Sequence, residues 1–153
     1  MLRNQIEAVV QSLSAQPSFL YGTANELNTL SDKTVFPCVF LYALSPLELS
    51  FRKTLSLDHN YSLYMAFLYQ TPFASYTAEN EGVVLQAVAM MEEFLIKLAN
   101  YREDNGRFFR INTDTKAQAI ALYDKFNVNL TGVDLKISLS PMYTNPVSLA
   151  PAL

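Results

Sequence analysis

The chain has 153 residues, of which 50% are hydrophobic and only 16% are charged, and its formal net charge is −3. This length suits one domain with a single two-layer core and argues against two separate cores. The acidic balance and the scattered lysines and arginines argue against a specific nucleic-acid partner. The low charged fraction predicts apolar surface that is covered either by a rich core or by another subunit.

Residues 2–14 predict an amphipathic helix, because their apolar side chains recur at helical spacing. These side chains are Leu2, Ile6, Val9, Val10 and Leu13. The spacing fits neither a secretory signal nor a membrane span, so we expect a protein made in the cytosol with no membrane segment. Pro17 ends the pattern. Residues 18–33 show no stable period and predict a short extended piece followed by a loop.

Residues 34–44 predict the first long strand, because the run is apolar enough to be covered on both sides. Pro37 inside the run favours an edge position or a bulge. Cys38 is expected to be a small core residue, since a single cysteine cannot form an internal disulfide. Ser45 and Pro46 predict the turn that follows.

Residues 47–57 alternate apolar and polar side chains, which is typical of a half-buried strand. The same period returns in residues 60–70. Asp58 and His59 lie between the two runs and predict a two-residue turn. Together with the preceding strand, these runs predict a three-strand antiparallel meander.

Residues 81–101 predict a long helix with a wide apolar stripe, preceded by a polar and aromatic loop at 71–80. Extended structure is expected to resume at 107–113, 117–130 and 133–140. The predicted fold class is therefore α+β, an antiparallel, meander-based sheet covered on one face by two helices. The core beneath the long helix is expected to contain Leu49, Phe51, Leu63 and Phe67.

Residues 1–140 are predicted to form the single domain, and residues 141–153 an extended C-terminal arm. The arm contains three prolines and several apolar residues, which favour an extended segment over a further sheet strand.

The chain offers few residues for catalysis or for cofactor binding. His59 is the single histidine, and turn chemistry explains its place between Asp58 and Asn60. The four glycines are isolated, so neither a P-loop nor a dinucleotide fingerprint can be written. Adjacent acidic residues such as Glu92 and Glu93 suit a solvated helix face better than an ion site. We therefore expect no catalytic residue, no cofactor and no metal ion.

The order of the predicted elements rests on the patterns at residues 2–13, 36–39, 47–57, 84–101 and 132–135. In this order the chain resembles the tail-terminator and tail-completion (neck) proteins of tailed bacteriophages. The resemblance implies a non-enzymatic α+β subunit of an oligomeric ring, usually sixfold, that joins or terminates the tail tube. It also implies a virion location, after assembly in the host cytoplasm.

Contacts between subunits, and with other phage neck or tail proteins, are expected at aromatic loops and at the arm. Apolar residues there are removed from water when they pack against a neighbouring subunit. A heterologous contact between subunits gives a ring when the rotation closes. The candidate interface residues are Phe19, Tyr21, Phe73, Tyr76, Met142, Tyr143 and Leu149.

Two other functions remain open on the sequence. The first is a small α+β ligand-binding module with an apolar pocket between helix and sheet, lined by Phe67, Met91 and Phe94. The second is a hot-dog-like thioesterase, in which Glu81 or His59 would have to act at a dimer interface.

Overall fold

The computed structural model describes residues 2–28, 34–43, 47–51, 57–72, 77–103, 106–111, 118–125 and 129–143. These residues form an α+β domain of three helices and seven strands. In chain order the elements are α1 (Leu2–Gln11), β1 (Ser18–Gly22), α2 (Ala24–Asn28), β2 (Cys38–Tyr42), β3 (Leu47–Phe51), β4 (Leu57–Gln70), α3 (Thr77–Asn100), β5 (Arg107–Ile111), β6 (Gln118–Lys125) and β7 (Leu130–Tyr143).

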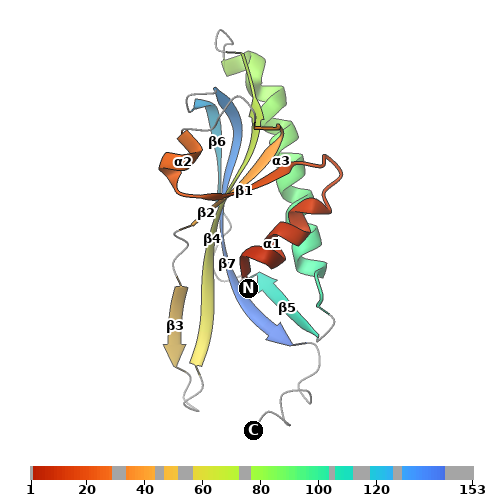
Figure 1. Cartoon of the computed structure of the whole chain (residues 1–153), viewed down its shortest axis with the longest axis vertical. Coiled ribbons are helices and arrows are strands. Elements are labelled where there is room, and N and C mark those ends of the chain that lie inside the picture. Colours follow the sequence, from red (N-terminus) through yellow and green to blue (C-terminus); the bar gives the residue numbers. More distant parts are fainter. Residues whose placement is uncertain are drawn as a thin grey trace.

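Two long strands, β4 and β7, form the centre of the sheet (Figure 1). They pair antiparallel, with register partners running from Tyr61 and Leu139 to Gln70 and Leu130. Each has 14 residues and therefore has different neighbours along its length. β2 and β6 flank one end of the pair, and β3 and β5 flank the other.

The sheet is mixed, so the prediction of an antiparallel sheet is only partly correct. β1 pairs with β2 in parallel, whereas the other described pairings are antiparallel. A parallel pair needs a crossover connection, and here α2 belongs to it. This helix has five residues, too few to show a readable hydrophobic period, so the sequence predicted only a loop.

The predicted hairpin of the second and third strands is confirmed in its pairing but not in its turn. Asp58 and His59 lie inside β4, opposite Ser50 and Leu49 of β3. The connection falls in residues 52–56, outside the described residues. Apolar alternation identifies strands, but it continues unchanged up to a hairpin tip and so does not locate the turn.

The predicted meander is wrong in its order. β3 does not lie between β2 and β4; both shorter strands pair with the same edge of β4, one beyond the other. β2 meets Met65 to Leu68, and β3 meets Leu57 to Tyr61. Pro37 precedes β2 rather than lying inside it. One long strand can pair with two short strands placed end to end along the same edge. A run of apolar residues does not show this arrangement.

Two helices cover one face of the sheet, as predicted, and a third lies on the other. In Figure 1, α1 and α3 lie on one side of the strands and α2 on the opposite side. α1 ends three residues earlier than predicted, and α3 begins at Thr77 rather than at residue 81.

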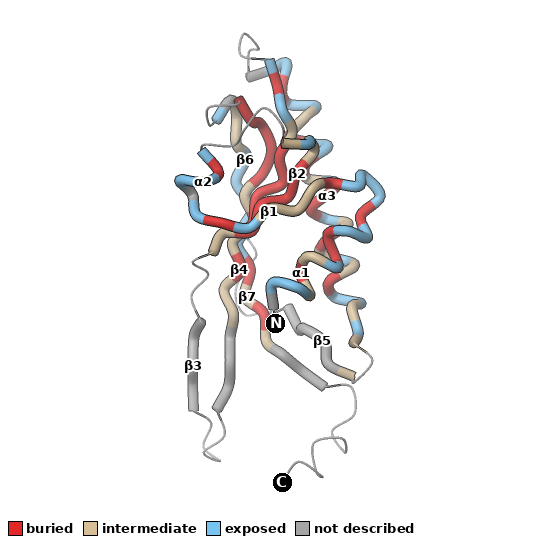
Figure 2. The backbone as a smooth tube through the Cα atoms, viewed as in Figure 1, coloured by how far each residue is buried: buried red, intermediate tan, exposed pale blue. Residues whose placement is uncertain are grey.

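The main core lies between the sheet and the pair α1 and α3 (Figure 2). Phe67 and Phe94 are fully buried there, and their ring centroids are 5.6 Å apart. Leu63 joins them, so the predicted core beneath the long helix is confirmed for Leu63 and Phe67. The side chains of Leu49 and Phe51 lie outside the described residues. The main core also contains Ile6, Val9, Val10, Leu13, Val39, Leu41, Met65, Met91, Leu98, Val133, Leu135, Ile137 and Leu139.

A smaller core lies on the α2 face of the sheet. Leu27 of α2 packs over the strands, and it is fully buried. The strand residues of this second core are Cys38, Phe40, Ala66, Leu68 and Leu130. The sheet is therefore covered on both faces at this end, which explains why the first predicted strand is apolar throughout.

The closing strands differ from the prediction at their ends. β6 stops at Lys125 and β7 begins at Leu130, where residues 117–130 had been predicted as one strand. β7 also runs on to Tyr143, so the start of the predicted arm is sheet: Pro141 pairs with Phe109 of β5. The described pairing of β7 with β4 ends at Leu139, so beyond that residue β7 has a strand on one side only. A proline, which lacks a backbone N–H, is tolerated at such an edge position. Residues 144–153 lie outside the described residues.

Candidate functional site

A pocket of about 430 Å³ opens on the α2 face of the sheet, beside the second core. Two adjacent rows of cross-strand partners build its floor. In one row Tyr64 pairs with Lys136, which pairs with Gln118 of β6. In the next row Ala66 pairs with Asp134, which pairs with Ile120. We call this cavity the Asp134 pocket; its principal lining residues are Tyr42, Tyr64, Gln118, Ile120, Asp134 and Lys136.

Asp134 is the acidic group of this pocket and is half-buried. Its Oδ1 accepts a hydrogen bond from the Tyr42 hydroxyl at 3.2 Å. Desolvation raises the pKa of the Asp134 carboxyl, and the hydrogen bond from Tyr42 opposes that shift. Burial, with the nearby Asp134 charge, raises the pKa of the Tyr42 phenol, so this hydroxyl stays protonated and acts as donor.

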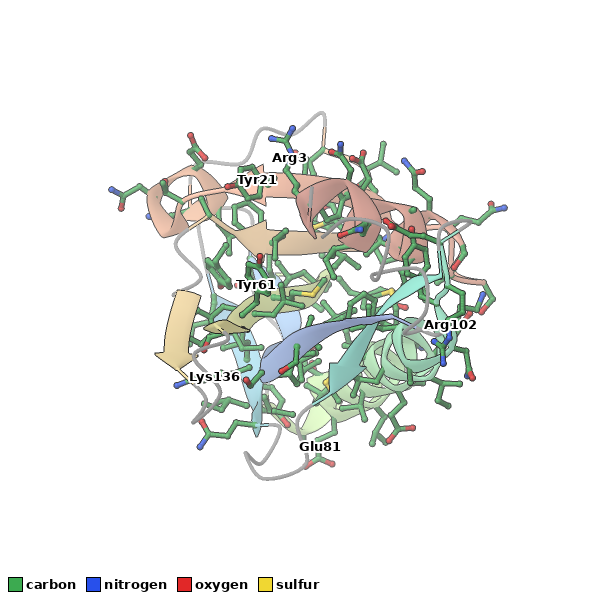
Figure 3. The ribbon with its side chains drawn as sticks, turned by 90° about the horizontal axis from the view of Figure 1, so that it is seen from below. Arg3, Tyr21, Tyr61, Glu81, Arg102 and Lys136 are labelled. Carbon is green, nitrogen blue, oxygen red and sulfur yellow. The ribbon has the colours of Figure 1, made fainter. Side chains whose placement is uncertain are left out.

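Lys136 is the basic group of the pocket. It lies on the same face as Asp134, two residues along β7, because side chains on a strand alternate between faces. Its Nζ lies over the Tyr64 ring, 5.1 Å from the centroid, in a cation–π contact. Figure 3 shows Lys136 on the side of the sheet away from α3.

The outward face of α3 carries a second feature, a row of exposed residues at heptad spacing. Leu85 is 68% exposed and Ile96 is 64% exposed, and small residues lie between and beyond them. Spacings of four and three residues keep all members on one side of the helix. This row, the outer α3 stripe, consists of Ala78, Gly82, Leu85, Ala89, Glu92, Ile96 and Ala99.

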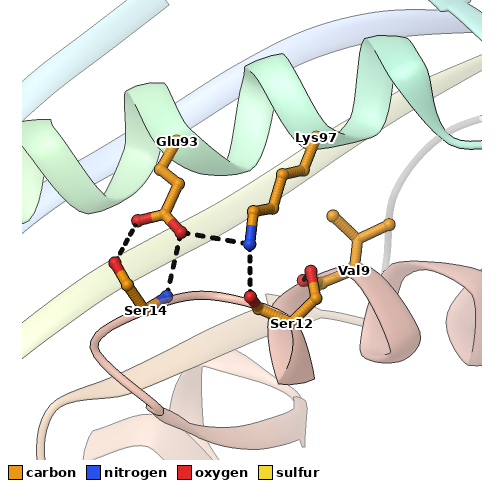
Figure 4. Close-up of polar contacts among 5 residues, drawn as sticks. All are labelled: Val9, Ser12, Ser14, Glu93 and Lys97. Atoms are coloured by element: carbon orange, nitrogen blue, oxygen red, sulfur yellow. Dashed lines mark hydrogen bonds and ion pairs between the residues drawn. The ribbon is translucent and has the colours of Figure 1, made fainter.

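A groove of about 450 Å³ between α1 and α3 adjoins this stripe, and Ile96 is part of its wall. Polar contacts fix the two helices beside it (Figure 4). The Ser14 N–H and hydroxyl donate to the Glu93 carboxylate at 2.9 and 2.7 Å, and Lys97 donates to the Ser12 carbonyl. Lys97 and Glu93 also form an ion pair at 3.2 Å. The groove therefore has walls held together by hydrogen bonds.

The predicted interface residues lie in different places. Phe19 is half-buried and packs against the main core, so it is committed to the fold. Tyr21 is 46% exposed, and the Arg3 guanidinium lies 5.0 Å from its ring centroid (Figure 3). Met142 and Tyr143 belong to β7, opposite Phe108 and Arg107 of β5, and their side chains lie outside the described residues. Phe73, Tyr76 and Leu149 are also outside the described residues.

The residues considered for chemistry are not brought together. Cys38 is fully buried, and burial raises the pKa of its thiol to about 12, so it carries no thiolate at neutral pH. Glu81 is exposed on α3 (Figure 3), whereas His59 lies in β4 with its side chain outside the described residues. Among the described residues, no group of three or more His, Cys, Asp or Glu side chains is arranged to hold a metal ion.

The apolar pocket that the ligand-binding hypothesis placed between helix and sheet is occupied by core side chains. Phe67, Met91 and Phe94 are all buried in the main core. The actual pocket lies on the opposite face and was missed by the sequence reasoning. The sequence feature that could have indicated this pocket is the pair Asp134 and Lys136, which alternate with apolar residues in the last strand. Because α2 was not predicted, this pattern indicated only a solvent-exposed sheet face.

No helix in the described part of the chain is long and apolar enough to cross a membrane. In comparisons with known proteins, no protein-family model matches this chain, and no curated protein matches it.

Proposed function

We propose that this chain is a non-enzymatic structural subunit of a ring-shaped homo-oligomer in the neck or tail of a phage-like particle. The outer α3 stripe is the observation that carries the proposal. A helix that covers a sheet normally turns polar residues outward, yet here Leu85 and Ile96 face solvent at 68% and 64% exposure. Exposed apolar residues in a row favour contact with another chain.

The stripe suits close packing against a neighbouring subunit. Gly82 and Ala89 carry little or no side chain, and a Cβ built at Gly82 meets no atom within 4 Å. Gly82 lies before Leu85, and Ala89 lies between Leu85 and Ile96 together with the charged Glu92. The two small residues allow another element to approach the helix closely while Leu85 and Ile96 fill its depressions. If the stripe meets a different surface of the next subunit, the contact is heterologous, and it gives a ring when the rotation from one subunit to the next closes.

The shape of the sheet gives the proposal further support. Along the long axis in Figure 1, β3 and its part of β4 extend past all three helices. The backbone N–H and C=O groups on the outer side of such strands can add a strand from a partner. This end of the sheet is where we place the attachment to other neck or tail proteins.

The test is the mass of the assembly over a concentration series, measured by light scattering and native mass spectrometry. We expect the wild-type chain to form a ring, with six subunits as the leading expectation. The double variant Leu85→Glu, Ile96→Glu should be monomeric, because charges in the contact would be desolvated. Gln86→Glu, an exposed position beside the stripe, is the matched control and should assemble normally.

Three outcomes would overturn this proposal. They are a wild-type monomer at all concentrations, a double variant that assembles as well as the wild type, or a two-fold dimer that goes no further. Circular dichroism of the double variant separates a lost contact from a lost fold.

The predicted role of the C-terminal segment is tested by a deletion that respects the sheet. Removing residues 141–153 would also remove the pairing of Pro141 with Phe109, so the cut belongs after Tyr143. Deleting residues 144–153 should weaken assembly, or docking to a partner ring, and leave the domain folded. Assembly and docking equal to those of the full chain would exclude the arm from the interface.

A ligand-binding module is the second candidate function. It is favoured by one observation, the Asp134 pocket, whose volume falls in the usual range for small-molecule sites.

A further inference from the structure

Asp134 is a half-buried carboxylate on a central strand, between β4 and β6. Its Oδ1 accepts a hydrogen bond from the neutral hydroxyl of Tyr42 at 3.2 Å. The nearest cation along the strand, Lys136, is placed over the Tyr64 ring instead. A partly desolvated carboxylate gains most from a positive charge at hydrogen-bond distance, and the open side of the pocket is where one can enter.

The walls of the Asp134 pocket suit an elongated cation with an apolar body. The Tyr64 ring on one side attracts positive charge to its face, as its contact with Lys136 already shows. Ile120 on the other side is 60% exposed and gives an apolar surface along which methylene groups can lie. An anion would be repelled by the Asp134 charge, and a purely apolar ligand would leave that carboxylate without a cationic partner.

We propose that the Asp134 pocket binds a primary alkylammonium or alkylguanidinium group. The charged head contacts the Asp134 carboxylate and the Tyr42 hydroxyl oxygen, and the methylene stem lies between Ile120 and the Tyr64 ring. The group can belong to a free amine or to a lysine or arginine side chain of a protein segment. This inference stands apart from ring formation, because the pocket is on the sheet face opposite α3.

Lys136 competes for the same site in this proposal. Its ammonium occupies the Tyr64 face and adds a like charge two residues from the carboxylate that binds the ligand. Removing the charge while keeping the stem, as in Lys136→Met, should therefore tighten binding of a cationic ligand. A general loss of packing would change affinity in the opposite direction, so this variant distinguishes the proposed role from a structural one.

In the experiment, n-butylammonium and n-butylguanidinium are titrated into the full chain. Binding is measured by NMR chemical shifts and by calorimetry. We expect dissociation constants on the order of 1 mM, with the largest shifts at Asp134, Ile120 and their strand neighbours. Asp134→Asn should weaken binding roughly tenfold and Lys136→Met should strengthen it a few-fold. Butyrate and n-butanol are the matched ligands without the positive charge.

The control variant is Glu81→Gln, which removes an exposed carboxylate on α3 and should leave affinity unchanged. A capped Gly-Lys-Gly peptide identifies the source of the cation. Binding of the peptide at least as tight as that of butylammonium assigns the site to protein side chains, and failure of the peptide alone assigns it to free amines. The proposal is overturned if neither probe binds, if butyrate binds equally, or if Asp134→Asn binds like the wild type.

Discussion

Glu93 of α3 accepts two hydrogen bonds from Ser14, one from its N–H at 2.9 Å and one from its hydroxyl at 2.7 Å. The segment that follows α1 is thereby attached to a helix that lies far along the chain (Figure 4). These bonds, followed by the contribution of Lys97, hold the pKa of the Glu93 carboxyl below its ordinary value of 4.5. The contact is therefore formed with the ionised acid.

Glu93 predicts a defined dependence of stability on pH. Because its pKa is lower in the folded chain, its contribution is fully present above the ordinary pKa of 4.5 and is lost as pH falls through the lowered value. The wild type should therefore lose more unfolding free energy between about pH 6 and about pH 3 than Glu93→Gln does. Urea unfolding at both pH values measures the difference; equal losses in the two proteins would rule out this contribution.

Phe94→Ala tests the main core. The ring is fully buried against Phe67, so its removal should lower the free energy of unfolding by about 3 to 5 kcal/mol. The exposed neighbour on the same helix, Gln86→Ala, is the control and should stay within about 0.5 kcal/mol of the wild type. Phe51→Ala is expected from the sequence to cost as much as Phe94→Ala. Denaturant melts that show a loss below about 1 kcal/mol for Phe94→Ala would place the ring outside a packed core.

Asn129 is predicted to be a sensitive position although it lies in a turn. It is buried, has a φ of 52°, and its side-chain amide donates to the Thr71 and Pro72 carbonyls at 3.0 and 2.9 Å. Asn129→Ala would lose these bonds and keep the left-handed backbone, at a cost of roughly 2 to 4 kcal/mol. Asn129→Gly loses the bonds but tolerates the backbone, so thermal unfolding should show a smaller loss. The opposite order would refute the backbone argument.

Gly132 is predicted to be intolerant of any side chain. A Cβ at this position would lie 1.9 Å from the Phe67 carbonyl oxygen, so β4 and β7 would have to separate. Gly132→Ala should cost at least about 2 kcal/mol. Gly82→Ala is the matched control: it adds the same methyl on a helix where the chain itself places no atom within 4 Å, and in the monomeric Leu85→Glu, Ile96→Glu background it should stabilise the chain by about 0.5 to 1 kcal/mol. Comparable melting temperatures for the two variants would contradict the close approach.

The sequence predicted those helices and strands in which the apolar periodicity continues over many residues. It missed features that depend on which faces of an element are covered. The alternation of Leu63, Met65 and Phe67 identified the buried face of β4 correctly, because one face is under a helix. The inner stripe of α3 was found for the same reason. Leu85 and Ile96 on its outer side were overlooked, because a core pattern already explained the helix.

Pairing partners were harder to predict than the strands themselves. The parallel position of β1 beside β2 depends on the crossover through α2, which has no local signal at five residues. The Asp134 pocket lies on the sheet face that α2 covers, and Thr23, the residue directly before α2, is part of its lining. Local patterns define faces, whereas the neighbours of each strand are set by long-range contacts.

The central pairing of β4 with β7 also determines how early during synthesis the sheet can form. α3, β5 and β6 all lie between these strands in the chain, so no stable sheet centre exists until β7 has been synthesised. A nascent chain on the ribosome would expose the apolar face of β4, including Phe67 and Met65, throughout that interval. Contacts this distant in sequence also slow folding. The sheet is therefore expected to form only once β7 is available, and folding is expected to depend on chaperones when the protein is produced rapidly.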